Sequence, residues 1–339
     1  MNLYFAPLEG VTGYIFRNIH REMFGGLDKY YAPFVSPTVN PCFKGKEIRD
    51  LLPENNDENV NLIPQILTNN AEYFIKAAKQ LMGLGYTKEF NLNTGCPSGT
   101  VVAKNKGAGF LRDLNGMERF FEELFTWRDQ LENGPEISVK TRIGVYSEDE
   151  FPQILDVYNK YPISELTVHS RTRAQMYKEK PNLDAFLYAT AHSTNPVVYN
   201  GDIRIVEDYQ KIIRICSGLS GDGGEPVENK ISEQDKKPGL AGVMFGRGLI
   251  ANPNLVNEIR GEAHITKEQI RAYHDRLYEA YEKEMRAEKH LLFKMKEFWN
   301  YISWNFVDEH KCAKMIRKCQ NLYKYHLAVE EIFNMMTII

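Results

Sequence analysis

Short, nearly continuous apolar runs alternate along the first 250 or so residues with segments whose apolar residues recur every three or four positions. Strands that are buried on both faces have such continuous apolar sequences, so the runs predict a parallel sheet. They span 3–8, 29–35, 60–67, 89–93, 137–141, 165–169, 197–200 and 240–245. The intervening segments predict helices over about 69–83, 115–131, 147–161, 182–192 and 205–216.

The ends of these segments fit the same alternation. Asn69 or Asn70 can cap the first helix, and Gly83 and Gly85 can end it. About eight strand–helix units predict an α/β fold, a closed (β/α)8 TIM barrel, with a doubly wound open sheet as the alternative. Segment 217–239, rich in Gly, Pro and charge, is predicted to be a solvated loop before the last strand.

The pattern changes near residue 255. A helix is expected to start after Thr266, with Ile270, Tyr273, Leu277 and Tyr281 at helical spacing, and further helices over about 290–304, 310–322 and 327–337. We therefore expect a catalytic barrel at 1–255 and a C-terminal all-α helical bundle domain at 262–339.

Composition narrows the class of protein. The 339 residues are 43% hydrophobic and 26% charged, which suits a soluble globular protein and excludes a disordered chain. No apolar run approaches the roughly 20 residues that cross a bilayer, and the N-terminus lacks a secretory pattern, so no membrane partner is expected. Five cysteines suggest no disulfide framework, and we expect a cytoplasmic protein.

Polar or glycine-rich groups follow almost every predicted strand. In a (β/α)8 barrel the carboxyl ends of the strands carry the chemistry, so these groups are candidate site residues. Lys140 follows a buried Val and needs a partner or a bound anion, whereas His169 alone could be an ordinary core histidine. Gly246 and Arg247 could hold a phosphate. Together with Gln65 and Asn200, these residues suit a phosphorylated planar cofactor.

Cys96 lies in a Gly-Cys-Pro turn directly after the fourth run. It has no Cys-x-x-Cys partner and no neighbouring His, so no metal site is expected. A free cysteine is more often a buried packing residue, which is our interpretation of Cys42, Cys216, Cys312 and Cys319. A loop at the functional end of a barrel is a poor place for packing, and we favour a chemical role for Cys96.

Six motifs occur in order at the predicted strand ends: APLEGVT, NLNTGCP, VKTRIG, TVHSRTR, YNGDI and MFGRG. Over residues 3–250 the chain resembles the tRNA-dihydrouridine synthase family. The resemblance implies an FMN-binding barrel, a helical C-terminal domain that helps to hold tRNA, and NADPH as reductant. Glu9, Gly13 and segment 217–239 depart from the family pattern, which leaves open the tRNA position modified.

Site roles follow from the resemblance residue by residue. Pro7, Leu8 and Glu9 would line the flavin ring, and Gln65 and Lys140 would bond its pyrimidine edge. The phosphate side would be surrounded by His169, Asn200, Gly201, Asp202, Gly246 and Arg247. Cys96 would be the general acid, and Asn93, Lys104 and Arg171 would lie near the uracil or the tRNA phosphates.

The implied reaction reduces the C5–C6 double bond of a uridine in tRNA to 5,6-dihydrouridine. NADPH reduces FMN, the flavin gives hydride to C6, and Cys96 gives a proton to C5. Three alternatives stay open: an FMN barrel reductase of a small substrate of the dihydroorotate or enoate type, an RNA-binding protein with an inert barrel, and an aldolase or lyase with Lys140 as Schiff-base nucleophile.

The net charge of −3 argues at first against a polyanionic partner. Between residues 286 and 324, however, nine basic and four acidic residues leave a balance of +5, interleaved with aromatic residues. Basic side chains can meet RNA phosphates. The helical domain is therefore the expected tRNA clamp, with Arg317 and Lys318 as phosphate contacts, in a protein that we expect to be a monomer.

Overall fold

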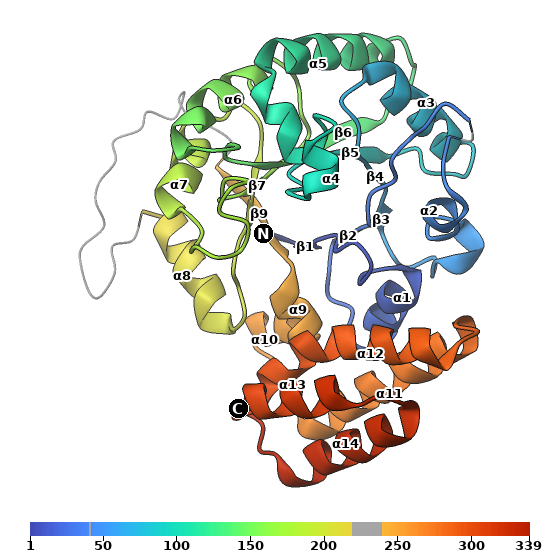
Figure 1. Cartoon of the computed structure of the whole chain (residues 1–339). Coiled ribbons are helices and arrows are strands. Elements are labelled where there is room, and N and C mark those ends of the chain that lie inside the picture. Colours follow the sequence, from blue (N-terminus) through green and yellow to red (C-terminus); the bar gives the residue numbers. More distant parts are fainter. Residues whose placement is uncertain (41, 219–238) are drawn as a thin grey trace.

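A computed structural model describes residues 1–40, 42–218 and 239–339. Within them, nine parallel strands form one sheet in the order β3-β2-β1-β9-β8-β7-β6-β5-β4 (Figure 1). The strands are β1 (Asn2–Phe5), β2 (Lys29–Tyr31), β3 (Leu62–Ile63), β4 (Gln65–Ile66), β5 (Glu89–Thr94), β6 (Glu136–Arg142), β7 (Leu166–His169), β8 (Val197–Asn200) and β9 (Leu240–Phe245).

The sheet closes through Pro64. Proline has no N–H to donate to a ladder, so it splits the predicted run 60–67 into β3 and β4. β3 pairs with β2 and β4 pairs with β5, so one stretch of chain supplies both edges of the sheet. The predicted (β/α)8 barrel is confirmed, and the open-sheet alternative is wrong.

Helices surround the barrel (Figure 1). The five predicted helices correspond to α3 (Ala71–Met82), α5 (Leu114–Asp129), α6 (Phe151–Tyr158), α7 (Leu183–His192) and α8 (Val206–Cys216). Asn70 is the residue that caps α3, because its side chain accepts from the Tyr73 backbone N–H at 2.9 Å. The predicted loop 217–239 lies almost entirely outside the described residues.

Several helices were absent from the sequence prediction: α1 (Tyr14–Met23), α2 (Gly45–Arg49), α4 (Gly99–Val102), α9 (Arg247–Ala251) and α10 (Leu255–Ile259). Most are too short to show a period. α1 is long enough, but two of its core-facing positions are Arg17 and His20, both fully buried. Polar residues at core positions hide the apolar repeat on which a sequence prediction depends.

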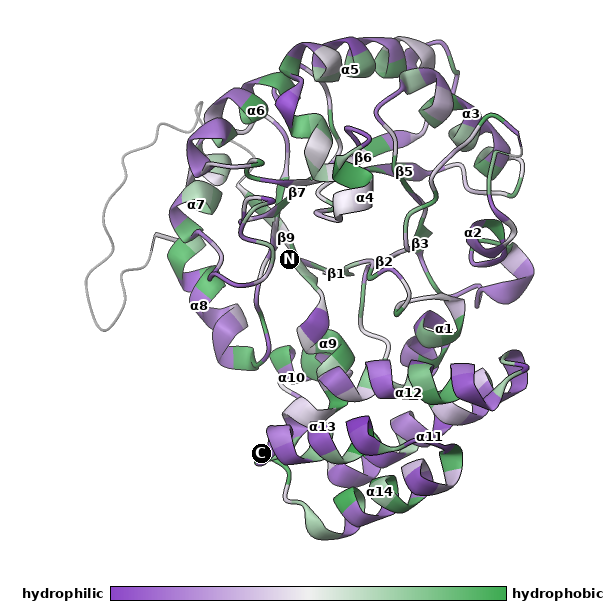
Figure 2. Cartoon of the chain, viewed as in Figure 1, coloured by the Kyte–Doolittle hydropathy of each residue, from purple (hydrophilic) through white to green (hydrophobic). Residues whose placement is uncertain are grey.

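The C-terminal region is all-helical, as expected. It contains α11 (Lys267–Glu284), α12 (Glu288–Ile302), α13 (Glu309–Lys318) and α14 (Leu322–Met335). Thr266 opens α11 with a reciprocal capping box with Gln269. Apolar and polar residues alternate along these helices, as amphipathic packing requires (Figure 2). Among the described residues, no helix is long and apolar enough to cross a membrane.

An aromatic contact joins this helical region to the barrel. Phe16 of α1 stacks on Phe298 of α12 at 5.7 Å between ring centroids and meets Tyr273 of α11 edge-on at 6.1 Å. All three rings are buried. Burying this much apolar surface fixes the orientation of α12 relative to the barrel. The boundary predicted between 255 and 262 stays a prediction.

Candidate active site

A cavity of about 260 Å³ opens at the carboxyl ends of the barrel strands. It brings together eight of the predicted residues: Pro7, Leu8, Glu9, Gln65, Asn93, Cys96, Lys140 and His169. They come from β1, β4, β5, β6 and β7 or the loops that follow them. Residues separated by more than 150 positions in the sequence therefore share one pocket because parallel strands end on one side of a barrel.

Among the residues that the structure describes, the Lys140 side chain has one hydrogen-bond partner, Asn200. Its Nζ donates to Asn200 Oδ1 at 2.8 Å, and Asn200 Nδ2 donates to the Met244 carbonyl at 2.8 Å, which fixes the orientation of the amide. Burial, and secondarily the charge of Arg142, lowers the pKa of Lys140 to about 7. The lysine therefore retains free donor capacity in a place where an anionic ligand group would favour its protonated form.

His169 is a neutral imidazole with an assignable tautomer. Burial and the surrounding cations, Arg142 first among them, hold its pKa well below the ordinary value. Arg171 Nη1 lies 3.0 Å from His169 Nε2, and since a guanidinium can only donate, Nε2 accepts. The proton is therefore on Nδ1, which leaves His169 with one donor for a ligand.

Asp202 holds two arginines together next to His169. It pairs with Arg171, which is 1% exposed, and accepts from Arg247 Nη2 at 2.8 Å. Burial alone would raise the pKa of Asp202, but the two guanidinium groups outweigh it and lower the pKa. Arg247 also stacks on Tyr177, with its Cζ 4.5 Å from the ring centroid. The two guanidinium groups and the single carboxylate together carry a net positive charge. This group suits a phosphate better than a neutral ligand.

A second, small cavity lies beside Arg247. It is lined by Gly201, Asp202, Ile203, Arg204, Arg247, Gly248 and Trp304. A Cβ on Gly248 would collide with the Ile203 carbonyl, and a Cβ on Gly201 would collide with the Tyr199 ring, so glycine is required at both positions. The ends of β8 and β9 thus approach closely, and the predicted Asn200, Gly201, Asp202, Gly246 and Arg247 lie together there.

Cys96 faces the pocket as a protonated thiol. Burial raises its pKa above the ordinary value. Its backbone N–H donates to Asn93 Oδ1 at 2.9 Å, and its carbonyl accepts from the Ala108 N–H at 3.0 Å. Gly107 allows the Ala108 N–H to approach the Cys96 carbonyl, because Gly107 has φ +55° and an added Cβ would lie 2.8 Å from that carbonyl oxygen. The loop therefore presents an uncharged S–H group, which suits a proton donor rather than a thiolate nucleophile.

Helix α12 also lines the pocket, which the sequence analysis did not anticipate. Glu297 and Tyr301 both border the cavity. Lys294 donates to the Gly10 carbonyl in the loop after β1 and pairs with Glu297 at 3.0 Å. No local sequence signal links these residues to the barrel mouth, because only the docking of α12 brings them there.

The predicted RNA contacts are dispersed. Asn93 lines the pocket, Lys104 is exposed and outside the cavity lining, and Arg171 is buried against Asp202.

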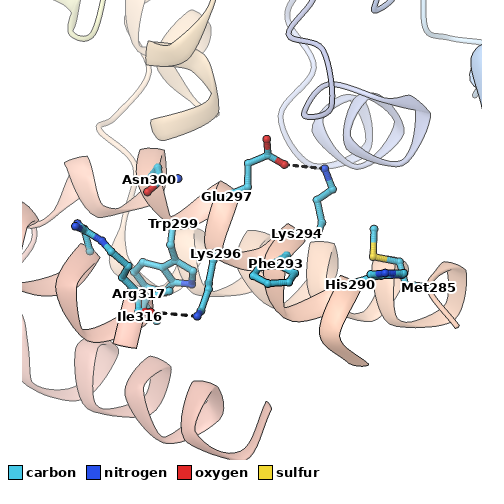
Figure 3. A pocket seen from close by; sticks show the side chains of 11 residues that line it. Met285, His290, Phe293, Lys294, Lys296, Glu297, Trp299, Asn300, Ile316 and Arg317 are labelled. Carbon is cyan, nitrogen blue, oxygen red and sulfur yellow. Dashed lines mark hydrogen bonds and ion pairs between the residues drawn. The ribbon is translucent and has the colours of Figure 1, made fainter. Parts of the chain in front are cut away.

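Lys318 is exposed at the end of α13. Arg317 lines an open groove between α12 and α13, with Lys296, Phe293 and other residues (Figure 3). These tRNA assignments stay predictions.

Comparison with known proteins identifies the family. The sequence model of the family described as Dihydrouridine synthase matches residues 4–331. The chain belongs to the dihydrouridine synthase family. The expectation of an enzyme of this family is therefore confirmed.

Individual relatives agree with this assignment. The chain is 28% identical over 283 residues to the probable tRNA-dihydrouridine synthase of Staphylococcus aureus strain Mu50. It is 29% identical over 288 residues to the probable tRNA-dihydrouridine synthase 2 of Bacillus subtilis strain 168. Each match covers 82% of this chain and 78% of the relative.

Proposed function

We propose that this protein reduces the C5–C6 double bond of a uridine in tRNA to 5,6-dihydrouridine, with FMN bound in the barrel and NADPH as reductant. The observation that carries the proposal is the protonated Cys96 thiol in one cavity with the Gln65 and Lys140 side chains. A proton donor faces a set of hydrogen-bonding groups suited to a planar heterocycle.

The residues present fit FMN. Pro7, Leu8 and Glu9 offer a wall for the ring, and Gln65 and Lys140 offer donors for the oxygens of its pyrimidine edge. The phosphate would be held by Arg247 and the Gly246 turn, supported by His169 and Asp202 with its paired arginines. When bound and reduced by NADPH, the flavin would supply the hydride that C6 of the uracil receives.

The protein's own residues would complete the reaction. Cys96 Sγ–H would give its proton to C5, so that one hydride and one proton add across the double bond. Lys140 would donate from Nζ to the flavin and favour the anionic form of the flavin. Burial and the charge of Arg142 lower the pKa of Lys140, so that its proton is readily shared with a neighbouring acceptor. Asn93 would orient the uracil from the wall between Gln65 and Cys96. The target base must leave its stack to enter this pocket.

Two measurements test the function together. Purified protein incubated with FMN and NADPH should oxidise NADPH in response to unmodified tRNA transcript, and nucleoside mass spectrometry should find dihydrouridine. Oxidation of NADPH by a small unsaturated carbonyl compound, with no response to tRNA, would favour the small-substrate reductase. Trapping of a carbonyl substrate on Lys140 by borohydride would favour the aldolase.

The groove between α12 and α13 is the proposed tRNA contact. Charge reversal by Arg317→Glu and Lys318→Glu should raise KM for tRNA about 10-fold or more, because two phosphate contacts become repulsive. NADPH-dependent reduction of the flavin should keep its rate. Added salt should weaken tRNA binding less in the variant than in wild type.

Lys79→Glu with Arg119→Glu provides the matched control, since both residues are exposed on the outer barrel helices α3 and α5. This control should keep the wild-type KM. Equal increases of KM in both double variants, or equal losses in flavin reduction and tRNA turnover, would contradict the assignment of the groove.

A further inference from the structure

A chain of buried hydrogen bonds runs inside the barrel from its floor toward the active site. Its floor end is Glu89, whose Oε1 accepts from Ser138 Oγ at 2.5 Å. Ser138 Oγ in turn accepts from Asn91 Nδ2 at 2.8 Å, and Asn91 Oδ1 accepts from Gln65 Nε2 at 2.7 Å. These side chains are at most 4% exposed, so solvent offers no substitute partners.

The series of hydrogen bonds continues without a break to the loop that carries Cys96. Gln65 Oε1 accepts from Asn93 Nδ2 at 2.7 Å. Asn93 Oδ1 then accepts from the backbone N–H groups of Gly95 at 3.0 Å and of Cys96 at 2.9 Å. A residue at the barrel floor is thereby linked to the backbone of the proposed general acid.

The two ends of the chain determine its direction. Glu89 also accepts from Lys29 Nζ at 2.7 Å and from Tyr31 Oη at 3.3 Å, so its carboxylate acts only as an acceptor. The Cys96 backbone N–H can only donate. An amide that rotated by half a turn would put two donors or two acceptors face to face. The buried chain therefore admits one orientation of each amide.

We propose that Glu89, Ser138 and Asn91 are positioning residues that act through Gln65 and Asn93 to set which groups the active-site wall offers to a ligand. Asn93 Oδ1 already accepts two hydrogen bonds, so the group that Asn93 has left to offer is an N–H donor. Gln65 Nε2 keeps a second N–H. These two N–H groups, on Asn93 and Gln65, select a planar heterocycle that presents carbonyl oxygens. The identification of this heterocycle as flavin or uracil rests on the proposed function.

Removing one link tests the chain in the full-length protein. Ser138→Ala keeps the strand but removes the donor to Glu89 and leaves Asn91 Nδ2 without its acceptor. We expect about 10-fold weaker FMN affinity, measured by quenching of flavin fluorescence, because a buried amide is left unsatisfied and can flip. Alkylation of Cys96 by iodoacetamide, measured on its peptide by mass spectrometry, should become about threefold faster as the loop loosens.

Ser164→Ala is the matched control. Among the described residues, the Ser164 hydroxyl is buried without a hydrogen-bond partner, so its removal breaks no chain. Both FMN affinity and Cys96 alkylation should stay near wild type. If Ser138→Ala matches Ser164→Ala in both measurements, the positioning role is wrong, even where Ser138→Ala lowers the unfolding midpoint.

Asn91→Asp adds a readout that simple destabilisation would not move. When ionised, the introduced carboxylate can accept from Gln65 but cannot donate to Ser138, whereas its protonated form regains one O–H donor. The ratio of variant to wild-type FMN affinity should therefore recover toward one as pH falls. The ionisable side chains packed around these hydrogen bonds, Tyr4, Lys29, Tyr31, Glu89, Lys140 and Glu165, are present in both proteins, so wild type measured over the same pH range is the reference.

Each outcome decides a different question. A ratio that does not change with pH contradicts the positioning role of Asn91. Failure of wild-type protein to bind FMN contradicts the proposed function instead. The alkylation of Cys96 can be compared between Ser138→Ala and Ser164→Ala without flavin. Even if wild type fails to bind FMN, this comparison decides whether the buried hydrogen bonds position the loop that carries Cys96.

Discussion

Cys96→Ala is expected to lower turnover on unmodified tRNA by about 10²–10⁴-fold, the usual contribution of a positioned general acid. The thiol is protonated at neutral pH because burial raises its pKa, so its loss removes a ready proton donor. Flavin affinity and the rate of NADPH-dependent flavin reduction should stay near wild type, because neither step needs that proton. Rapid-mixing kinetics that follow flavin absorbance would separate the two half-reactions.

Cys216→Ala is the matched control, since Cys216 is also a partly exposed free cysteine but lies on α8, outside the pocket. It should keep full activity. Wild-type turnover in Cys96→Ala would refute the acid assignment, and a parallel loss of flavin reduction would point to a collapsed pocket instead.

The second large effect concerns Lys140, whose removal should weaken flavin binding and stabilise the flavin-free protein. Lys140→Met removes a charged donor from the proposed pyrimidine edge, which should cost about 10–100-fold in FMN affinity. The same change also removes a buried charge that the free protein must accommodate without an anionic partner.

The sign of the stability effect follows from the lowered pKa. Folding shifts the pKa of Lys140 from its ordinary 10.5 to about 7, so between these values the unfolded chain holds more protons than the folded one. Wild-type stability therefore rises with pH across this window. Below pH 7 both states are protonated, and Lys140→Met should be more stable than wild type by on the order of 2–4 kcal/mol. This charge-dependent part of the difference should disappear as pH approaches 10.5.

Chemical denaturation of the flavin-free proteins at pH 6, 8 and 10 would measure this trend. Lys79→Met, at an exposed position of α3, should leave stability unchanged at each pH. A Lys140→Met variant that is less stable than wild type at pH 6, or a difference that does not vary with pH, would contradict the buried, partner-poor lysine described above.

Most of the barrel could be predicted from the sequence because its strands are buried on both faces. That burial leaves near-continuous apolar runs, and eight of them in alternation with helices define the topology. The prediction was weakest where a core position is polar. Arg17 and His20 of α1, and the floor residues Glu89 and Glu165, which pair with Lys29, are buried through specific partners rather than through apolar character.

Much of the candidate site could also be found, since strand ends are recognisable in the sequence. Gln65, Lys140 and His169 were candidates from that position and Pro7 from the family resemblance, and the structure gathers all four in one cavity. Glu297 and Tyr301 could not be found, because α12 belongs to another region of the chain and reaches the pocket by docking on the barrel, through Phe298 and Lys294. The pKa of Lys140 likewise depends on burial that no sequence pattern reports.

The sequence by itself determined the strand order, the barrel, the helical appendage and the end of the barrel that holds Cys96, since each follows from residue pattern along the chain. Only the tertiary structure decided which groups meet and which way they face. The amides of Gln65 and Asn93 are each able to donate or accept, and their orientation is set by Glu89, Ser138 and the Cys96 backbone. Hydrogen-bond direction in a buried chain depends on every partner at once, and those partners come from different strands.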